Sequence, residues 1–217
     1  MARTIMILGQ SGRGKSFSLR NLPVKPTIIL NHERKTLPFK GSSKFNELRP
    51  KNVKETFNAL DKIIADKAVK VVVIESLSAF LDMLLAEARI LHKNWDVFTH
   101  YNEKIYYLFE RIRKLNDAGK HTVVISHNDI NINDLTGETT INAKVKGQEW
   151  KGAVEKEFDI VVHAEMNMNE DGTPEYHFRT QTDGLVPAKA PYEMFDDILI
   201  ENDMNFVLKK VHEYDKT

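Results

Sequence analysis

The chain alternates between short apolar runs and longer segments in which apolar residues recur at helical spacing. Continuous, β-branched apolar runs lie at Thr4–Leu8, Thr27–Leu30, Val69–Ile74, Thr122–Ser126 and Ile160–His163. Such runs are typical of strands buried on both faces of a mostly parallel sheet. Amphipathic helical patterns cover Val53–Lys67, Ser76–His92 and Asn102–Leu115. The alternation predicts an α/β fold with right-handed crossovers and a mostly parallel central sheet flanked by helices.

Three segments depart from this alternation. Asn128–Trp150 is polar and has neither period, which predicts a long functional or disordered loop. Tyr176–Thr182 alternates after the turn at Asp171–Thr173, which predicts an antiparallel strand in a small C-terminal addition. The polar segment Tyr192–Thr217 is expected to be helical.

Composition narrows the class of protein. The 217 residues suffice for a single α/β domain over 1–217, and 41% hydrophobic with 29% charged residues predicts a soluble globular chain. Lys+Arg and Asp+Glu both number 31, so a nucleic-acid site would need a local basic patch. With no cysteine, no signal-peptide pattern and no apolar run near the ~20 residues of a membrane span, we expect a cytoplasmic protein.

The stretch with the most specific chemistry follows the first apolar run and matches G-x-x-x-x-G-K-[ST] without a mismatch. Its candidate nucleotide-binding residues are Gly9, Gln10, Ser11, Gly12, Arg13, Gly14, Lys15, Ser16 and the next residue, Phe17. Phe17–Leu22 can continue as a helix, which completes the strand–loop–helix context of a phosphate site. Lys15 would reach the β- and γ-phosphates, and the Ser16 hydroxyl would bind Mg²⁺. A Gly-rich turn that only caps a helix is the alternative, but it leaves Lys15 and Ser16 without a purpose.

Two acidic residues come at or near the ends of predicted strands. Glu75 ends the run Val71–Ile74 in the layout of a Walker B acid near Mg²⁺, and Glu33 comes soon after Ile28–Leu30. Ligands of open α/β sheets bind at the carboxyl ends of strands, so both carboxylates are candidates for the catalytic site. The alternative for each is a helix N-cap or a solvated loop carboxylate.

Polar and cationic residues elsewhere complete the candidate site. Ser126 and His127 end the fourth apolar run and could contact the γ-phosphate, reporting its loss to the loop that follows; a capping Ser and a solvent-facing His are the alternative. Arg179, Lys189 and Lys151 are candidates for a cation that acts in trans on the γ-phosphate of another subunit. The alternative for each is a solvated surface charge.

With these residues in place, the chain resembles the RecA-like core ATPases encoded by bacteriophages, the AAA-type phage nucleotide-binding proteins. The resemblance runs from about Arg3 to about Asp197 and rests on the phosphate loop and on four short motifs at 31–35, 71–78, 123–128 and 158–163. It implies a RecA-like P-loop NTPase that binds ATP and Mg²⁺, in the host cytoplasm if phage-encoded. Glu33 then looks like the catalytic glutamate and Glu75 like the Walker B acid. Ser126 and His127 look like a sensor pair.

The chain also departs from the family pattern. Glu replaces the usual Asp at position 75, His127 stands where RecA has Gln, and RecA's extra terminal domains are absent, which puts full strand exchange in doubt.

The resemblance predicts an ATPase for DNA recombination or single-strand annealing, with Lys15, Glu33, Glu75, His127 and Arg179 as catalytic residues. Its partners would be single-stranded DNA, further copies in a homo-oligomer with nucleotide at the subunit interface, and a single-strand-binding protein.

Asn128–Trp150 takes the place of the DNA loop, and its basic and aromatic candidates are Lys144, Lys146, Trp150 and the adjacent Lys151. The acidic Asp129, Asp134, Glu138 and Glu149 weaken this electrostatic signal, and Trp150 could instead anchor the loop to the core. A nucleotide-dependent switch or loader acting on a protein partner remains the alternative function. A small-molecule kinase is disfavoured because no Arg-rich lid follows the phosphate site.

Overall fold

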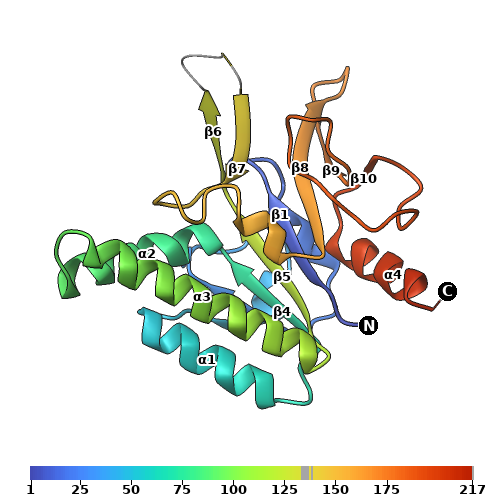
Figure 1. The fold of residues 1–217 in the computed structure, drawn as a ribbon. Helices are drawn as coiled ribbons and strands as arrows, with labels where there is room; N and C mark the ends of the chain where they lie inside the picture. The colour runs from blue at the N-terminus through green and yellow to red at the C-terminus, as the bar shows by residue number, and fades with distance from the viewer. Residues whose placement is uncertain (133–136, 138, 217) are drawn as a thin grey trace.

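The computed structural model describes residues 1–132, 137 and 139–216. An eight-stranded sheet crosses the molecule, and most of its strands run parallel (Figure 1). The strands of this sheet are β1 (Thr4–Leu8), β2 (Thr27–Asn31), β3 (Asn46–Leu48), β4 (Val71–Glu75), β5 (His121–Ser126), β8 (Ile160–Met168), β9 (Pro174–Arg179) and β10 (Leu199–Glu201). Their spatial order is β10-β9-β8-β1-β5-β4-β2-β3, with parallel pairing from β8 to β3 and antiparallel pairing among β8, β9 and β10. The predicted α/β fold with a mostly parallel sheet is therefore confirmed.

Helices cover both faces of the sheet, as the buried strand pattern requires. The helices α1 (Val53–Ala65), α2 (Leu77–Leu91) and α3 (Asp96–Asp117) pack with Met6 and Leu8 on one face (Figure 1). The 3₁₀ helix η1 (Ser16–Asn21) and α4 (Met204–Tyr214) pack with Ile5 and Ile7 on the other. Alternate residues of β1 thus enter two separate apolar clusters, and this burial on both faces fixes the register of the central strand.

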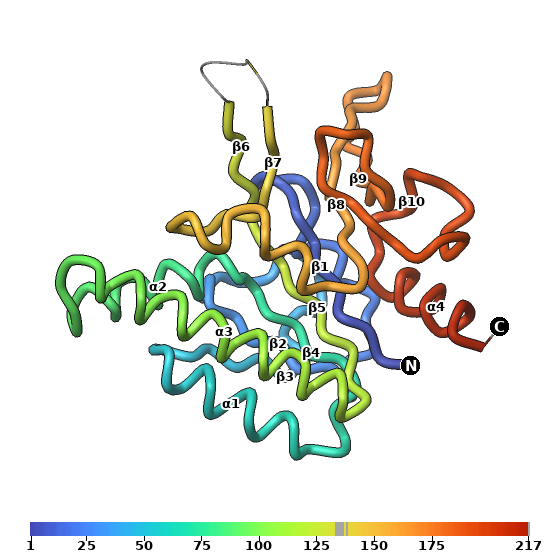
Figure 2. Tube along the Cα trace, in the orientation of Figure 1, coloured from blue at the N-terminus to red at the C-terminus, as the bar shows by residue number. Residues whose placement is uncertain are grey.

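Two further 3₁₀ turns, η2 (Ser42–Lys44) and η3 (Val154–Glu157), lie in connections. The two chain ends lie near each other (Figure 2), because Asp215 accepts a hydrogen bond of 2.5 Å from Arg3 and lies 3.0 Å from the Met1 amino group. Across the described residues, we find no helix whose length and apolar character would let it cross a membrane.

Several predicted elements need correction. The helix expected after the phosphate loop is 3₁₀ rather than α, and β3 was missed because its three residues carry no apolar run. Of the C-terminal segment 192–217, only Met204–Tyr214 is an α-helix, and β10 lies before it. The antiparallel addition is confirmed, although β9 and β10 extend the edge of the main sheet.

The long-loop prediction for Asn128–Trp150 is wrong for much of the segment. The strands β6 (Asn128–Ile132) and β7 (Thr139–Ala143) pair antiparallel in a separate two-stranded sheet. This sheet projects from the end of the molecule towards which β8 and β9 also extend (Figure 1). Its side chains are mostly polar, and Ile130 and Ile132 are 49% and 65% exposed. Ile130, Ile132 and Ile141 share one face of this sheet, but so short an alternation inside a polar segment was not recognised as a strand pattern.

Candidate nucleotide-binding site

The phosphate loop connects β1 to η1 at the carboxyl edge of the sheet. Its three glycines have positive φ angles of 153° at Gly9, 79° at Gly12 and 84° at Gly14, which favour glycine over residues with a Cβ. A Cβ on Gly9 would also lie 2.9 Å from the Ala164 carbonyl oxygen of β8. The close approach to β8 therefore fixes where the loop begins.

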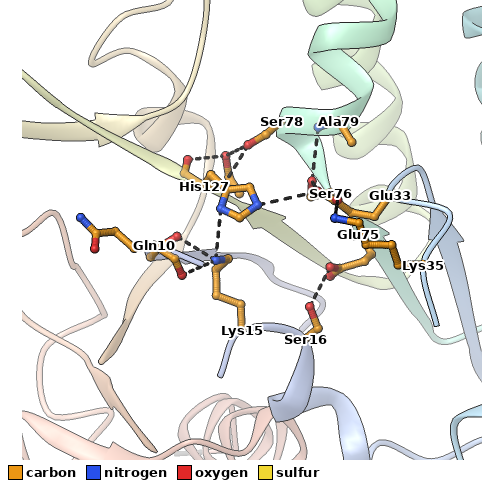
Figure 3. A network of polar contacts seen from close by, with 12 residues as sticks. Gln10, Lys15, Ser16, Glu33, Lys35, Glu75, Ser76, Ser78, Ala79 and His127 are labelled. Atoms are coloured by element: carbon orange, nitrogen blue, oxygen red, sulfur yellow. Dashed lines mark hydrogen bonds and ion pairs between the residues drawn. The ribbon is translucent and has the colours of Figure 1, made fainter. Parts of the chain in front are cut away.

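Lys15 is held inside this loop (Figure 3). Its ammonium donates hydrogen bonds of 2.8 Å to the Gly9 carbonyl and 2.7 Å to the Gln10 carbonyl, and its Nζ lies 3.4 Å from His127 Nδ1. Burial lowers the pKa of Lys15 to about 8, although the charges of Glu75 and Glu33 act in the opposite direction. Both carbonyl acceptors belong to the loop, so the cation is aligned with the backbone that would surround a phosphate.

Ser16 and Glu75 form a buried pair beside Lys15 (Figure 3). The Ser16 hydroxyl donates a hydrogen bond of 2.7 Å to Glu75 Oε1, whereas Glu75 Oε2 is buried and has no hydrogen-bond partner among the described residues. Burial raises the pKa of Glu75 to about 7, against the hydrogen bond from Ser16 and in the same direction as the charge of Glu33. Hydroxyl and carboxylate oxygens are ligands that Mg²⁺ prefers, so a divalent cation here would compensate the unpartnered oxygen. The two residues therefore fit a Mg²⁺ site.

Glu33 lies on the same side of the cleft and is held by Ser76. Ser76 Oγ donates a hydrogen bond of 2.7 Å to Glu33 Oε1 and also caps α2 by accepting from the Ala79 N–H at 3.2 Å. Burial raises the pKa of Glu33, but hydrogen bonds from Ser76 and Lys35 outweigh it and leave the pKa below its usual value. Glu33 is thus an ionised, oriented carboxylate, and Ser76 rather than Glu75 is the N-cap of α2.

His127 connects the cation and this carboxylate. Its Nδ1 lies 3.4 Å from Lys15 Nζ, and its Nε2 lies 3.7 Å from Glu33 Oε1 (Figure 3). Burial, with the charge of Lys15 acting in the same direction, lowers the pKa of His127. The expected partner, Ser126, is fully buried and lies 3.1 Å from the Ser78 hydroxyl of α2, so only His127 of this pair lines the cleft.

These residues line one cleft of about 520 Å³, within the size range of small-molecule sites. The segment 35–38, Asn31, Ile125 and Tyr176 also line the cleft and were not among the predicted residues. Tyr176 reaches the loop from β9, where no motif marked it. Asn31 could have been predicted in the same way as Glu33, because it is a polar residue at the carboxyl end of β2.

The three candidate cations for a finger lie outside this cleft. Arg179 donates a hydrogen bond of 2.5 Å to Glu165 and lies 3.8 Å from Asp183. The backbone of Lys189 pairs with that of Val161, and Val161 is paired in turn with Met6 in the middle of β1. Lys189 therefore lies beside the middle of the sheet and not at the edge where the phosphate loop begins. Lys151 is exposed and lines a separate cavity of about 190 Å³ with Lys146.

The DNA-loop candidates are spread over the segment that follows His127. The Lys144 N–H donates a hydrogen bond of 2.8 Å to the His127 carbonyl, and the Lys146 N–H donates one of 3.3 Å to the Tyr101 hydroxyl. Asp129 lines the cavity of Lys146 and Lys151, whereas Asp134 and Glu138 lie outside the described residues.

Base stacking by Trp150 does not fit the structure. The indole is 4% exposed and packs against Tyr106 and Phe109 of α3, with ring centroids 4.7 and 5.1 Å away. Trp150 is therefore the hydrophobic anchor of this segment. Trp150 was predicted as a DNA contact because lysines flank it in the sequence. That pattern alone does not distinguish a stacking residue from a hydrophobic anchor.

A glycine-rich loop between a parallel strand and a helix, with Lys15 and Ser16 at its end and Glu75 of β4 bonded to Ser16, defines a P-loop nucleoside triphosphatase. Residues 1–192 match the family model described as an AAA domain, so the chain belongs to this family and is an AAA-type P-loop ATPase. A comparison with curated proteins found no match.

Proposed function

We propose that the chain binds ATP with Mg²⁺ in the 520 Å³ cleft and hydrolyses it. The observation that carries the proposal is the buried Ser16–Glu75 pair, which leaves one carboxylate oxygen unpartnered at the end of the phosphate loop. Mg²⁺ would supply charge neutralisation at the phosphates. Ser16 and Glu75 would hold it, and Lys15 would exchange its two loop carbonyls for phosphate oxygens.

Glu33 is the proposed general base. Its carboxylate is ionised and oriented by Ser76, so it can accept a hydrogen bond from a water molecule and then its proton. His127 lies between Glu33 and Lys15 and is the proposed sensor of the γ-phosphate. Loss of the γ-phosphate would change the electrostatic surroundings of Lys15 and Glu33, the two charged neighbours of His127.

We further propose that the nucleotide state acts on single-stranded DNA through the β6–β7 sheet. His127 precedes the first residue of β6, and its carbonyl accepts the Lys144 N–H at the end of β7. A shift of His127 would therefore move both strands. Lys144, Lys146 and Lys151 are the proposed contacts to DNA phosphates, and recombination or strand annealing is the proposed process.

A nucleotide-dependent switch that acts on a protein partner is the second candidate. It is favoured by an exposed apolar cavity of about 690 Å³ that Trp95, Phe98 and Tyr106 line next to the segment 147–149. Trp95, Phe98 and Tyr106 are 84%, 36% and 49% exposed, and exposed apolar side chains grouped in this way mark interaction sites.

The ATP hydrolysis rate with and without single-stranded DNA, measured alongside size-exclusion chromatography, tests these proposals. DNA-stimulated turnover would support the DNA role, and hydrolysis that DNA leaves unchanged would favour the protein-partner role. A well-folded chain that neither binds nor hydrolyses ATP would contradict the proposed function as a whole.

A further inference from the structure

Asn202 is a buried amide without a partner. It is 2% exposed, and neither its Nδ2 nor its Oδ1 has a hydrogen-bond partner among the described residues. Buried polar groups are nearly always paired, because an unpaired one keeps its desolvation penalty. Asn202 also lies beyond residues 1–192, the part of the chain that matches the AAA domain family. Its unpaired amide therefore calls for a ligand that the family match does not specify.

The Asn202 amide lies against the phosphate loop. A Cβ on Gly14 would be 3.2 Å from Asn202 Nδ2 and 2.7 Å from Cδ1 of Tyr176, so both side chains pack on this glycine. Tyr176 also lines the 520 Å³ cleft, and its ring centroid lies 5.8 Å from that of Phe17. The amide thus packs against Tyr176, an aromatic wall of the nucleotide cleft, without lining the cleft itself.

Contacts on both sides hold this wall in place. Arg20 donates a hydrogen bond of 2.6 Å to the Asn202 carbonyl and lies 4.3 Å from the centre of the Phe17 ring. Arg13 of the phosphate loop donates one of 2.9 Å to the carbonyl of Met166, the residue paired with Tyr176 across β8 and β9. These contacts of Arg13 and Arg20 therefore connect the phosphate loop and η1 to the strands that carry Tyr176 and to Asn202.

Sheet order separates this wall from the hydrolytic residues. Glu75 ends β4 and Glu33 follows β2 on one side of β1, whereas Tyr176 belongs to β9 and Asn202 follows β10 on the other side. A triphosphate in the loop that directs its γ-phosphate towards Glu33 would direct its nucleoside towards Tyr176.

We propose that Tyr176 and Asn202 form the nucleobase subsite of the triphosphate site, an inference that rests on the proposed nucleotide binding. The base stacks on the Tyr176 ring, and a turn of that ring away from Gly14 opens the buried Asn202 amide to the hydrogen-bonding edge of the base. An amide offers one donor beside one acceptor, which matches the N1 acceptor and N6 donor of adenine. This pairing would satisfy both unpartnered atoms of Asn202.

Calorimetric titration of the full chain with Mg²⁺ and either ATP or inorganic tripolyphosphate tests the subsite. The wild type should bind ATP at least about tenfold more tightly than tripolyphosphate, because stacking and base pairing add to phosphate binding. Tyr176→Ala and Asn202→Ala should each weaken ATP about tenfold and leave tripolyphosphate unchanged, while Tyr176→Phe should keep ATP affinity. Asn202→Asp, which removes the donor with little change in shape, should weaken ATP more than GTP, since guanine offers two donors on the same edge.

Equal affinities of the wild type for ATP and tripolyphosphate would overturn the subsite while leaving the phosphate site intact. Unchanged ATP affinity in the Tyr176→Ala and Asn202→Asp variants would also overturn it, as would a parallel loss of both ligands, which indicates a structural role. A wild type that binds neither ligand would contradict the proposed nucleotide binding itself, so the two failures are distinguishable.

Discussion

Ionisable side chains at the end of the phosphate loop are buried close to one another. Lys15 and Glu75 are 6% exposed, and burial shifts the pKa of the lysine down and that of the carboxyl up. Each has hydrogen bonds that a bound triphosphate and cation could replace. Ionisable groups with strongly shifted pKa values cluster at functional sites, because the burial and charged neighbours that shift them also serve ligand binding.

Glu33→Gln should retain ATP binding and slow hydrolysis by about two orders of magnitude or more, the typical contribution of a positioned base. The substitution keeps the shape of the side chain and removes only its capacity to accept a proton. Steady-state phosphate release with calorimetric ATP binding measures both effects, and Glu110→Gln on the exposed face of α3 is the control. Normal turnover by Glu33→Gln would reduce Glu33 to a loop carboxylate.

His32 should make the fold sensitive to acid. Burial lowers the pKa of His32 to about 4, against the nearby charge of Glu33, whereas an unfolded histidine titrates near 6.5. Between these values the unfolded chain binds more protons, so the free energy of unfolding falls as the pH falls from about 6.5 to about 4. The loss attributable to His32 is on the order of 3 kcal/mol at most.

Urea unfolding at pH 7 and pH 5 measures this effect. His32→Gln can still bond to Thr56, which lies 3.1 Å from His32 Nε2, and should lose less stability at pH 5 than the wild type. The exposed His212→Gln should behave like the wild type. An equal pH dependence in all three proteins would contradict the assignment to His32.

At the scale of elements, the β6–β7 sheet is tied to the core by the segment that follows it. Trp150 packs on α3, and the Ala143 N–H donates a hydrogen bond of 2.5 Å to Glu155. The proposed DNA-binding element therefore projects from a fixed base, which would allow His127 to transmit a change at the nucleotide site.

Trp150→Ala should lower the free energy of unfolding by about 3–5 kcal/mol, the usual cost of removing a buried large aromatic side chain. Trp95→Ala offers a matched control, because Trp95 is 84% exposed and its loss should change stability by less than about 0.5 kcal/mol. Chemical denaturation of both variants makes the comparison. Unchanged stability of Trp150→Ala together with weaker binding of an oligonucleotide would restore the stacking role.

Sequence patterns predicted the elements that are buried on both faces and missed those that are not. Thr4–Leu8 was predicted to the residue because every side chain of β1 is buried. The strands β6 and β7 escaped, since the alternation of Ile130 and Ile132 is short and lies in a polar, partly exposed segment. The same limit applies to the site: Lys15, Ser16, Glu33, Glu75 and His127 follow strands in recognisable motifs, whereas Tyr176 and Asn202 reach the loop only through antiparallel pairing at the far edge of the sheet.

At the scale of the whole molecule, no candidate finger lines the cleft within the described residues, which motivates a site shared between copies. Arg179→Ala should then abolish turnover while ATP binding persists, and mixing it with Lys15→Ala subunits should restore part of the activity. Glu165→Gln, which removes the ion pair with Glu165 and keeps Arg179, controls for the loss of that pair. A fully active monomer by size-exclusion chromatography, with no rescue on mixing, would exclude a shared site.

The central claim is that the phosphate loop binds ATP through Lys15 with Mg²⁺ held by Ser16 and Glu75, and calorimetric titration of ATP tests it most directly. The wild type should bind ATP, and removal of Mg²⁺ should weaken the binding. A folded Lys15→Ala variant should lose tight binding, because the loop loses the buried cation beside the phosphates, whereas the exposed Lys44→Ala should not. Equal ATP affinity in the wild type and in folded Lys15→Ala would contradict the account.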